Sequence, residues 1–362
     1  MSSRRRTSSN SSTSRILEDG IIGLAWMDSD SGMNGWSYIN SEGNLISDDE
    51  AEEQIATLDI FNPVDTMLGS NYMVKFPAGI IDAWTGVSGT DAEGKFCIAV
   101  GSISKLSGSF IRHPAFYNYR TGKAINEVYI GKYKSSGASG SAANSLPNVK
   151  PVVSITAPNF YATCAKVGTD YHCLTFYERY WVGTLMLIES KGDIIGKHGY
   201  GSIQGSVVLT GSSGKFILGL DDFYNNCYEW LDGIHQNTSS ITLPKPGTVA
   251  WTSSNNTSTN YISAGFNFSN NGYQQGILNQ EISSLGFNTN ILLIGSTTHG
   301  KSYSKSTCYI PDYQYNSRNA TNIYGLSGGC YSADDYVCAF NVNVNRSPSS
   351  TTTNIGGRLA RW

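Results

Sequence analysis

The sequence has few charged residues and no long apolar run. Only 15% of its 362 residues are Asp, Glu, Lys or Arg, against about 25% in an average soluble protein. The formal net charge is −3, which argues against nucleic-acid binding by bulk electrostatics. No stretch of about 20 apolar residues occurs, so no membrane-spanning helix is expected. The 40% of hydrophobic residues can nevertheless form a folded core.

The motifs of common catalytic and metal sites are also missing. The seven cysteines include no CxxC pair, and the five histidines show neither HExxH nor HxH spacing. Neither a GxSxG nucleophile motif nor a GxxxxGK[ST] phosphate loop occurs. We therefore expect no catalytic residue, no cofactor and no metal. Because no secretion signal is recognisable, we also expect the cysteines to be mostly reduced and buried.

Residues 1–19 are rich in Ser and basic residues. Arg4, Arg5 and Arg6 lie among Ser, Thr and Asn, and the apolar pair at 16–17 is followed directly by acidic residues. This pattern lacks the apolar core of a signal peptide, so we expect none in this segment. The segment is either a solvated tail or a peg that orders against a partner protein.

Hydrophobic periodicity predicts an α+β fold with one long helix and many short strands. A hairpin is expected over residues 36–46, and the acidic run at 48–53 predicts a solvated helix start. Alternating apolar and polar residues predict further strands between 72 and 133. A linker rich in small residues follows at 135–145. Apolar residues at i, i+3 and i+4 predict the long helix from Tyr171 to Glu189.

Three segments in the C-terminal half carry a family resemblance. Gly219–Gly233 resembles the GLxDxxGNVWEWxxD signature of the formylglycine-generating-enzyme-like branch of the C-type lectin fold. Gly328–Tyr331 resembles that family's GGSW/Y motif, and Asn354–Arg361 resembles its terminal NIGFRLAR. The order and separation of the three segments also agree with the family. The resemblance implies a C-type-lectin-like domain.

The N-terminal half is similar to bacteriophage virion proteins that carry this fold. The similar segments are Trp36–Ser47, Met73–Pro77, His113–Phe116, Val128–Tyr133, Val149–Pro151 and Leu185–Glu189. Such proteins include tail-tip and fibre adhesins, some of them diversified by retroelements, of which the phage major tropism determinant is the known type. We therefore divide the chain into a basic N-terminal peg (1–19), a β-rich virion-attachment region (20–134) and a C-type-lectin-like ligand-binding domain (135–362).

The resemblance implies a non-enzymatic virion protein on the surface of a phage tail or particle, made in the bacterial cytoplasm without a signal peptide. Its expected partner is a bacterial surface receptor, either a glycan or a protein. It would contact other virion proteins through its N-terminal region, with Arg4, Arg5 and Arg6 in the attachment, and would form a homodimer or homotrimer. The alternative is a structural head-fibre, decoration or baseplate protein without receptor binding.

Two enzymatic alternatives are weaker. Formylglycine-generating enzymes use a copper-binding cysteine pair about five residues apart, whereas Cys330 and Cys338 are eight positions apart. This spacing argues against an oxidase. A pair of carboxylates could also serve a glycosidase. The candidates for that pair are Asp221, Asp222, Glu229 and Asp232.

The segment after Gly329 has the composition of a binding surface. Tyr offers a large contact area at low entropic cost, and Ser and Asn offer adaptable hydrogen bonds. The same residues could also be ordinary polar surface. Around position 342, Asn alternates with apolar residues, which predicts a strand with Asn outward. The predicted ligand-binding residues are Tyr331, Ser332, Asp334, Asp335, Tyr336, Asn341 and Asn343.

The family resemblance also implies a set of fold anchors. Two histidines are assigned separately. Among the anchors, Glu229 and Trp230 are expected to be buried. His113 is expected to be a packed structural histidine, and His172 to face solvent or cap the long helix. The expected fold anchors are Glu229, Trp230, Gly328, Gly329 and Arg358.

Overall fold

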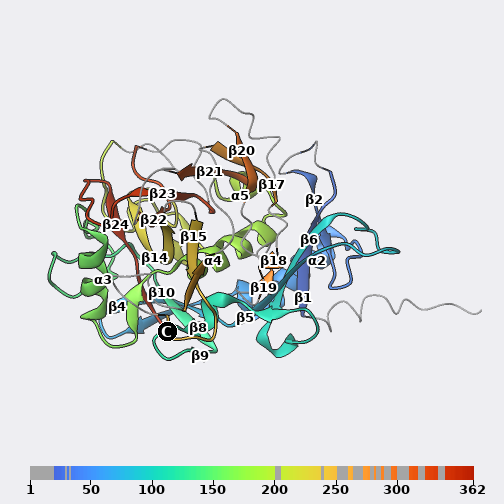
Figure 1. Cartoon of the computed structure of the whole chain (residues 1–362), viewed down its shortest axis with the longest axis horizontal. Helices are drawn as coiled ribbons and strands as arrows, with labels where there is room; N and C mark the ends of the chain where they lie inside the picture. Colours follow the sequence, from blue (N-terminus) through green and yellow to red (C-terminus); the bar gives the residue numbers. More distant parts are fainter. Residues whose placement is uncertain are drawn as a thin grey trace, which may run out of the picture.

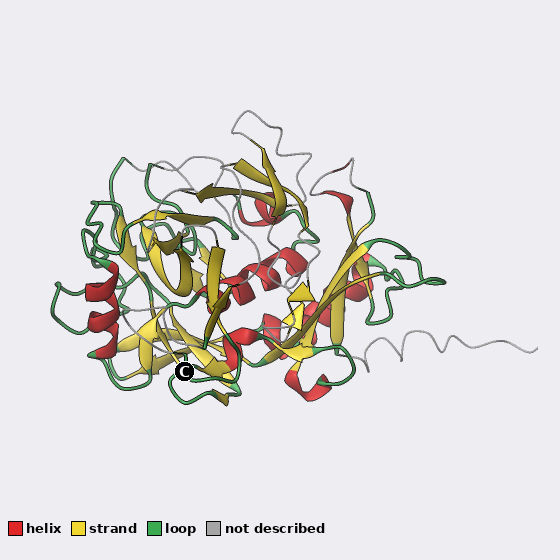
Figure 2. Ribbon diagram, in the orientation of Figure 1, coloured by secondary structure: helices red, strands yellow, loops and turns green. Residues whose placement is uncertain are grey.

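The computed structural model has mixed helix and strand content, with the elements arranged as in Figures 1 and 2. It describes residues 20–199 except 29–30 and 32–33, 205–250 except 238–239, 260–263, 272–277, 281–282, 287–288, 295–299, 310–316, and 323–362 except 333–338. The predicted peg with Arg4, Arg5 and Arg6 lies outside these residues.

The first sheet, on the right of Figure 1, is antiparallel with strand order β2-β1-β6-β5-β7. Its strands are β1 (Ile21–Trp26), β2 (Trp36–Ile39), β5 (Gly79–Thr85), β6 (Phe96–Ser102) and β7 (Ile111–Arg112). A bridge between Ile39 and Leu45 closes the predicted hairpin.

Helix α2 (Asp48–Thr57) follows that hairpin and begins at the acidic run, as predicted. Ser47 and Glu50 form a reciprocal capping box at its start, and the acidic first turn is favoured by the positive end of the helix dipole. Ala51 and Gln54 are buried, whereas Glu52 and Glu53 face solvent. The helix therefore packs against the rest of the protein through a narrow face that includes Ala51 and Gln54, and its acidic side is exposed.

The second sheet joins strands from both halves of the sequence in the order β11-β25-β10-β4-β3. Its strands are β3 (Val64–Leu68), β4 (Asn71–Pro77), β10 (Glu127–Gly131), β11 (Tyr171–Cys173) and β25 (Leu359–Arg361). The predicted long helix therefore starts later than expected, because residues 171–173 pair with the C-terminal strand instead. The sheet also runs across the predicted boundary between residues 134 and 135.

The segment 135–145, expected to be a linker, is packed into the fold. Ser135 and Ser145 are buried. The backbone N–H of Ser135 donates to the carbonyl of Gly357 at 2.9 Å, and Ser136 forms a bridge with Asn144. Long-range hydrogen bonds fix this segment, so composition alone gave the wrong prediction here.

Helix α4 (Phe176–Glu189) runs through the centre of the molecule, and every residue from Phe176 to Ile188 is buried. Thr175 and Glu178 form its capping box. Packing around the helix is close: a Cβ on Gly79 would lie 2.2 Å from the Trp181 ring. The helix is buried on all sides, as expected for a core element, and its charged residues Glu178 and Arg179 are buried with it.

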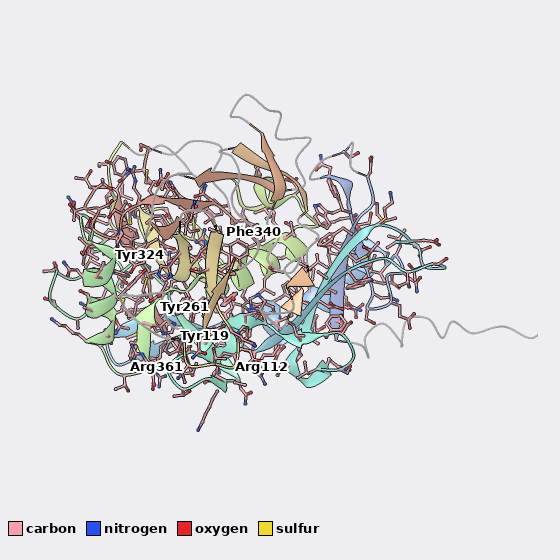
Figure 3. The ribbon with its side chains drawn as sticks, viewed as in Figure 1. Arg112, Tyr119, Tyr261, Tyr324, Phe340 and Arg361 are labelled. Atoms are coloured by element: carbon pink, nitrogen blue, oxygen red, sulfur yellow. The ribbon has the colours of Figure 1, made fainter. Side chains whose placement is uncertain are left out.

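The third sheet occupies the upper part of Figure 1 and has the strand order β16-β15-β14-β22-β23-β21-β17-β20, with β24 parallel to β14. Its strands are β14 (Tyr228–Asn237), β15 (Ser240–Pro244), β16 (Tyr261–Ser263), β17 (Gly272–Ile277), β20 (Gly295–His299), β21 (Ile310–Asn316), β22 (Ile323–Ser327), β23 (Val342–Arg346) and β24 (Ile355–Gly357). Tyr119, Tyr261 and Tyr324, which are labelled in Figure 3, are buried in the hydrophobic core.

Shorter elements connect these layers. The remaining helices are α3 (Ala157–Ala165), α5 (Ile194–His198), η2 (Asp59–Phe61), η3 (Ile103–Lys105) and η4 (Pro114–Phe116). The remaining strands are β8 (Tyr117–Asn118), β9 (Lys123–Ala124), β12 (Phe216–Ile217), β13 (Leu220–Asp221), β18 (Glu281–Ile282) and β19 (Phe287–Asn288). One hydrophobic core contains residues from Ile22 to Trp362, so both halves of the sequence contribute to it.

Candidate functional site

A buried cluster of charges lies close to the start of the predicted binding segment, because Glu229 pairs with Ser327 across two neighbouring strands. Glu229 of β14 is fully buried, as are the three basic residues around it. One carboxylate oxygen, Oε1, accepts from Lys134 Nζ and from Arg358 Nε, both at 2.8 Å. Arg179 of α4 lies 3.5 Å from the other oxygen. We call these four residues the Glu229 cluster.

The charges of this cluster stabilise one another. Burial alone would raise the pKa of Glu229, but Arg358, Lys134 and Arg179 together lower it to about 2. Glu229 is therefore ionised in the folded protein at neutral pH. A carboxylate so surrounded by basic side chains holds together the elements that carry them.

Arg358 also ties together backbone segments that are distant in the sequence. Its Nη1 donates to the carbonyl of Gly131 at 2.8 Å, and its Nη2 donates to the carbonyl of Asp221 at 2.7 Å. The planar guanidinium can direct several donors at once. A single residue of the C-terminal motif therefore joins β10, β13 and β14.

The other predicted anchors are also buried or conformationally constrained. Trp230 Nε1 donates to the carbonyl of Ile155 at 2.9 Å, and the ring is fully buried. Gly328 has a φ of +84°, and a Cβ there would lie 3.2 Å from the carbonyl oxygen of Phe223. The burial predicted for Glu229 and Trp230 is confirmed.

The turn after β13 connects the first motif to the second. The backbone N–H of Asn225 donates to the carbonyl of Gly328 at 2.5 Å, and the carbonyl of Asn226 accepts from the N–H of Tyr331 at 2.9 Å. The Asn226 side chain in turn bonds Asp222 at 3.0 Å. The turn at Asn225 and Asn226 therefore holds the backbone that carries Tyr331 in place.

The predicted ligand face is only partly within the described residues. Tyr331 is half-buried and Ser332 is exposed. The Tyr331 hydroxyl lies 3.5 Å from Thr353 Oγ1, and Cys330 Sγ lies 3.2 Å from Ser332 Oγ. Asp334, Asp335 and Tyr336 lie outside the described residues, as does Cys338, the second cysteine of the oxidase alternative.

The outward orientation predicted for Asn341 and Asn343 is wrong. Their exposed fractions are only 4% and 9%, while Phe340, Val342 and Val344 are fully buried. Strand β23 lies between β22 and β21, and both of its faces are covered. Alternation indicates a solvent-facing side only where one face of the sheet stays open.

The histidine predictions had different outcomes. His113 is fully buried, and its Nδ1 accepts from the N–H of Ala115 at 3.1 Å, as expected for a packed structural residue. His172 is not at the surface. It is buried, hydrogen-bonded to Glu178 at 2.8 Å, and stacked on Trp362 with ring centroids 3.9 Å apart.

The carboxylates considered for a glycosidase are buried as well. Asp232 is 1% exposed, and its Oδ1 accepts from the N–H of Gly233 at 2.7 Å. Burial raises its pKa to about 7, with a smaller contribution from the charge of Glu178. Asp221 accepts from the N–H of Gly211 at 2.8 Å. Both carboxylates are buried and accept hydrogen bonds from backbone N–H groups.

Lys134 and Arg179 were not predicted, although both contact Glu229. Arg179 had a sequence signal: with its neighbour Glu178 it lies in a segment of aromatic and apolar residues. A charge at such a position needs a buried partner. Lys134 had no comparable signal.

The cysteines that the structure describes are free and buried, as expected: Cys97, Cys164, Cys173, Cys227 and Cys330. Within the described part of the chain, no group of three or more His, Cys, Asp or Glu residues could hold a metal ion. None of the helices described here combines the length and apolar character needed to cross a bilayer.

No protein-family model matches the sequence, and no curated protein matches it. Among solved structures, PvdO from Pseudomonas aeruginosa is similar at 12% identity, covering 83% of this chain and 97% of that one, with a TM-score of 0.38. The Treponema denticola variable protein 1 aligns at 11% identity over 83% and 98%, with a TM-score of 0.34. A Major Tropism Determinant U1 variant aligns at 9% identity over 82% and 73%, with a TM-score of 0.31. These likenesses are too distant to assign a function.

Proposed function

We propose that this chain is a non-enzymatic receptor-binding protein of a bacteriophage particle, built on a C-type-lectin-like fold. The surface that includes Tyr331 and Ser332 would contact a bacterial surface receptor. In the assembled particle the N-terminal region would contact other virion proteins, and several copies would act together to increase avidity.

One observation carries the proposal. The residues of the three C-terminal motifs meet in and around the Glu229 cluster, and the turn at Asn225 and Asn226 holds the backbone of the Tyr331 segment through two hydrogen bonds. A rigid base that presents Tyr and Ser at the surface suits recognition, because little entropy is lost when these side chains are ordered on binding.

The buried carboxylates support the non-enzymatic part of the proposal. Glu229 and Asp232 are surrounded by protein, whereas an acid–base pair must reach its substrate. Glu229 is also held ionised by three cations, which makes it a poor proton donor at neutral pH.

The test is a binding assay with purified protein on a panel of bacterial cells, on a glycan array, and on phage particles that lack the protein. We expect the protein to bind one cell type or one glycan class. The Tyr331→Ala variant should bind at least about tenfold more weakly, because an aromatic contact residue is a typical hot spot. The Tyr331→Ala/Tyr336→Ala double variant should lose more.

Tyr72→Ala is the matched control, because Tyr72 is an exposed tyrosine (40%) on β4 of the second sheet. Its binding should equal that of the unmodified protein. Equal binding by all the variants would overturn the assignment of the face. Binding only to phage particles that lack the protein, and to no cell or glycan, would overturn receptor binding and support the structural alternative.

A further inference from the structure

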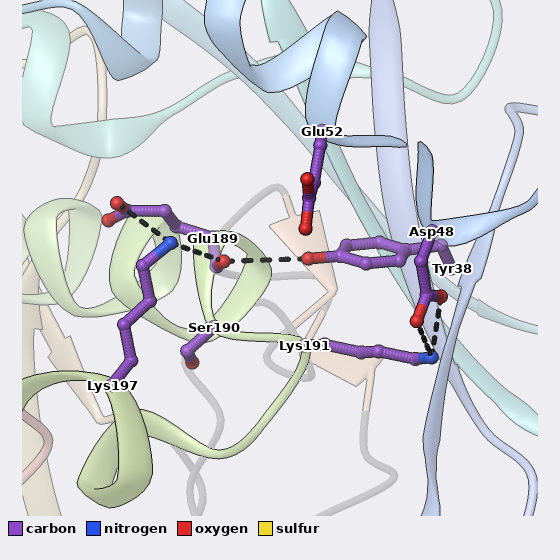
Figure 4. A pocket seen from close by; sticks show the side chains of 7 residues that line it. All are labelled: Tyr38, Asp48, Glu52, Glu189, Ser190, Lys191 and Lys197. Atoms are coloured by element: carbon purple, nitrogen blue, oxygen red, sulfur yellow. Dashed lines mark hydrogen bonds and ion pairs between the residues drawn. The ribbon is translucent and has the colours of Figure 1, made fainter. Parts of the chain in front are cut away.

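A polar pocket of about 320 Å³ opens between the first sheet and the C-terminal end of α4 (Figure 4). It is lined by Tyr38, Asp48, Glu52, Glu189, Ser190, Lys191 and Lys197. Its volume is at the lower end of the range for small-molecule sites, roughly 300–1,000 Å³. The pocket is therefore large enough for one small polar molecule.

Two ion pairs form opposite walls of the pocket. Lys191 Nζ contacts both carboxylate oxygens of Asp48, at 2.6 and 2.8 Å. Lys197 Nζ lies 3.1 Å from Glu189 Oε1 and donates to the Glu189 carbonyl at 2.9 Å. An ammonium group has three donors, so each lysine keeps one N–H beyond these contacts.

Glu52 gives the pocket its excess of negative charge. It projects from the exposed side of α2 toward the hydroxyl of Tyr38 (Figure 4). The two lysines balance Asp48 and Glu189, so the carboxylate of Glu52 makes the sum of the five charged side chains −1. This sum favours a cationic group on the ligand.

Tyr38 supplies a fixed polar group at the base of the pocket. Its side chain is 4% exposed, and its hydroxyl donates to the Glu189 carbonyl at 3.5 Å. Burial, together with the charges of Asp48, Glu52 and Glu189, raises its pKa well above the ordinary value. The hydroxyl stays protonated, and beyond its contact with the backbone N–H of Lys191 it keeps one lone pair that could accept from a ligand.

We propose that this pocket binds a small molecule that carries a primary ammonium group beside oxygen acceptors, the chemistry shared by amino sugars and free amino acids. The ammonium would bind the carboxylate of Glu52 and the hydroxyl of Tyr38. The oxygen acceptors would take the remaining N–H donors of Lys191 and Lys197. The proposal is independent of the receptor-binding face.

The experiment is a calorimetric titration of the full chain with D-glucosamine, L-serine and D-glucose, at a slightly acidic pH that keeps the amines protonated. We expect glucosamine, serine or both to bind at least about tenfold more tightly than glucose, because only they can form a charge-assisted hydrogen bond with Glu52. Glucosamine alone would identify an amino sugar, and serine alone an amino acid.

Glu52→Gln should weaken the binding of the ammonium compound by about tenfold or more. Glu53→Gln is the matched control, because Glu53 is the next exposed acid on α2 and does not line the pocket. It should bind as the unmodified protein does. Equal binding of glucose, no binding of any of the three compounds, or an unchanged Glu52→Gln would overturn the proposal. None of these variants alters Tyr331, so failure here is distinguishable from failure of receptor binding.

Discussion

Two groups of paired charges in the molecule have similar distances between their charged atoms but differ in solvent exposure. In the Glu229 cluster, the contacts with Lys134 and Arg358 are 2.8 Å long and all side chains are 0% exposed. In the pocket near Tyr38, Lys191 lies 2.6 Å from Asp48, but these side chains are 36% and 61% exposed. The comparison separates charges that hold the fold together from charges that solvent or a ligand can reach.

The physical difference between the two groups is the dielectric environment. A charge that loses its partner in the interior keeps a large desolvation cost, whereas an exposed charge is rehydrated and screened. The Glu229 cluster therefore cannot lose one member without a large effect. The pocket can exchange a partner at small cost, which is a requirement for reversible binding.

The largest expected effect is that of Glu229→Gln. This change leaves Lys134, Arg179 and Arg358 buried around a neutral amide, and it should lower the free energy of unfolding by about 3–5 kcal/mol. Urea or guanidinium denaturation followed by circular dichroism measures this. A loss below about 1 kcal/mol would show that the buried charges do not depend on the carboxylate.

The same variant also tests pH dependence. Because the folded pKa of Glu229 is lowered to about 2, its stabilising contribution is complete above the unfolded value of about 4.3 and is lost as pH falls toward 2. The unmodified protein should lose this contribution between those two pH values, and Glu229→Gln should not.

Asp232→Asn should have the next largest effect, in the opposite direction. Burial raises the pKa of Asp232 to about 7 in the folded state. Between about pH 4 and pH 7 the unfolded state therefore loses this proton while the folded state keeps it, and the free energy of unfolding falls as the pH rises. At pH 8 the asparagine should stabilise the protein by roughly 1–4 kcal/mol, while near pH 4 the two proteins should be alike.

Denaturation of both proteins at the two pH values checks this prediction. Equal stability differences at pH 4 and pH 8 would contradict it, because a packing change alone has no reason to depend on pH. The two variants then contrast two buried carboxylates. The pKa of Glu229 is lowered by three nearby cations, whereas the pKa of Asp232 is raised by burial.

The smallest expected effect is that of Lys191→Met in the pocket. Exposed ion pairs contribute only about 0–1 kcal/mol, so the loss of the contact with Asp48 should change the free energy of unfolding by no more than that. Thermal or chemical denaturation measures the change, with Lys134→Met as the buried counterpart. Similar losses in the two variants would remove the proposed distinction between the groups.

Much of the local structure could be predicted from the sequence. The acidic run predicted the start of α2, and the apolar periodicity predicted α4, because these signals act within a few neighbouring residues. Residues 171–173 form a strand instead of a helical turn because their partner, β25, comes from the far end of the chain. Local periodicity contains no information about such a partner.

The candidate site shows the same division. The motifs predicted Glu229, Trp230 and Arg358 as fold anchors, and they predicted burial for the first two. The cations Lys134 and Arg179 were missed. The aromatic and apolar residues around Arg179 indicate burial, but nothing near either residue in the sequence indicates that its partner is Glu229.

The sequence by itself determined the alternation of polar and apolar residues, the helix caps, the low charge content and the motifs that carry the family resemblance. Only the tertiary structure decided which charges are buried together and which faces of a strand are covered. Asn343 is the clearest case, since its alternating pattern suits an open surface, but β23 lies between two other strands with both faces covered. Burial is a property of neighbours that are distant along the chain, and this is why the pattern alone could not supply it.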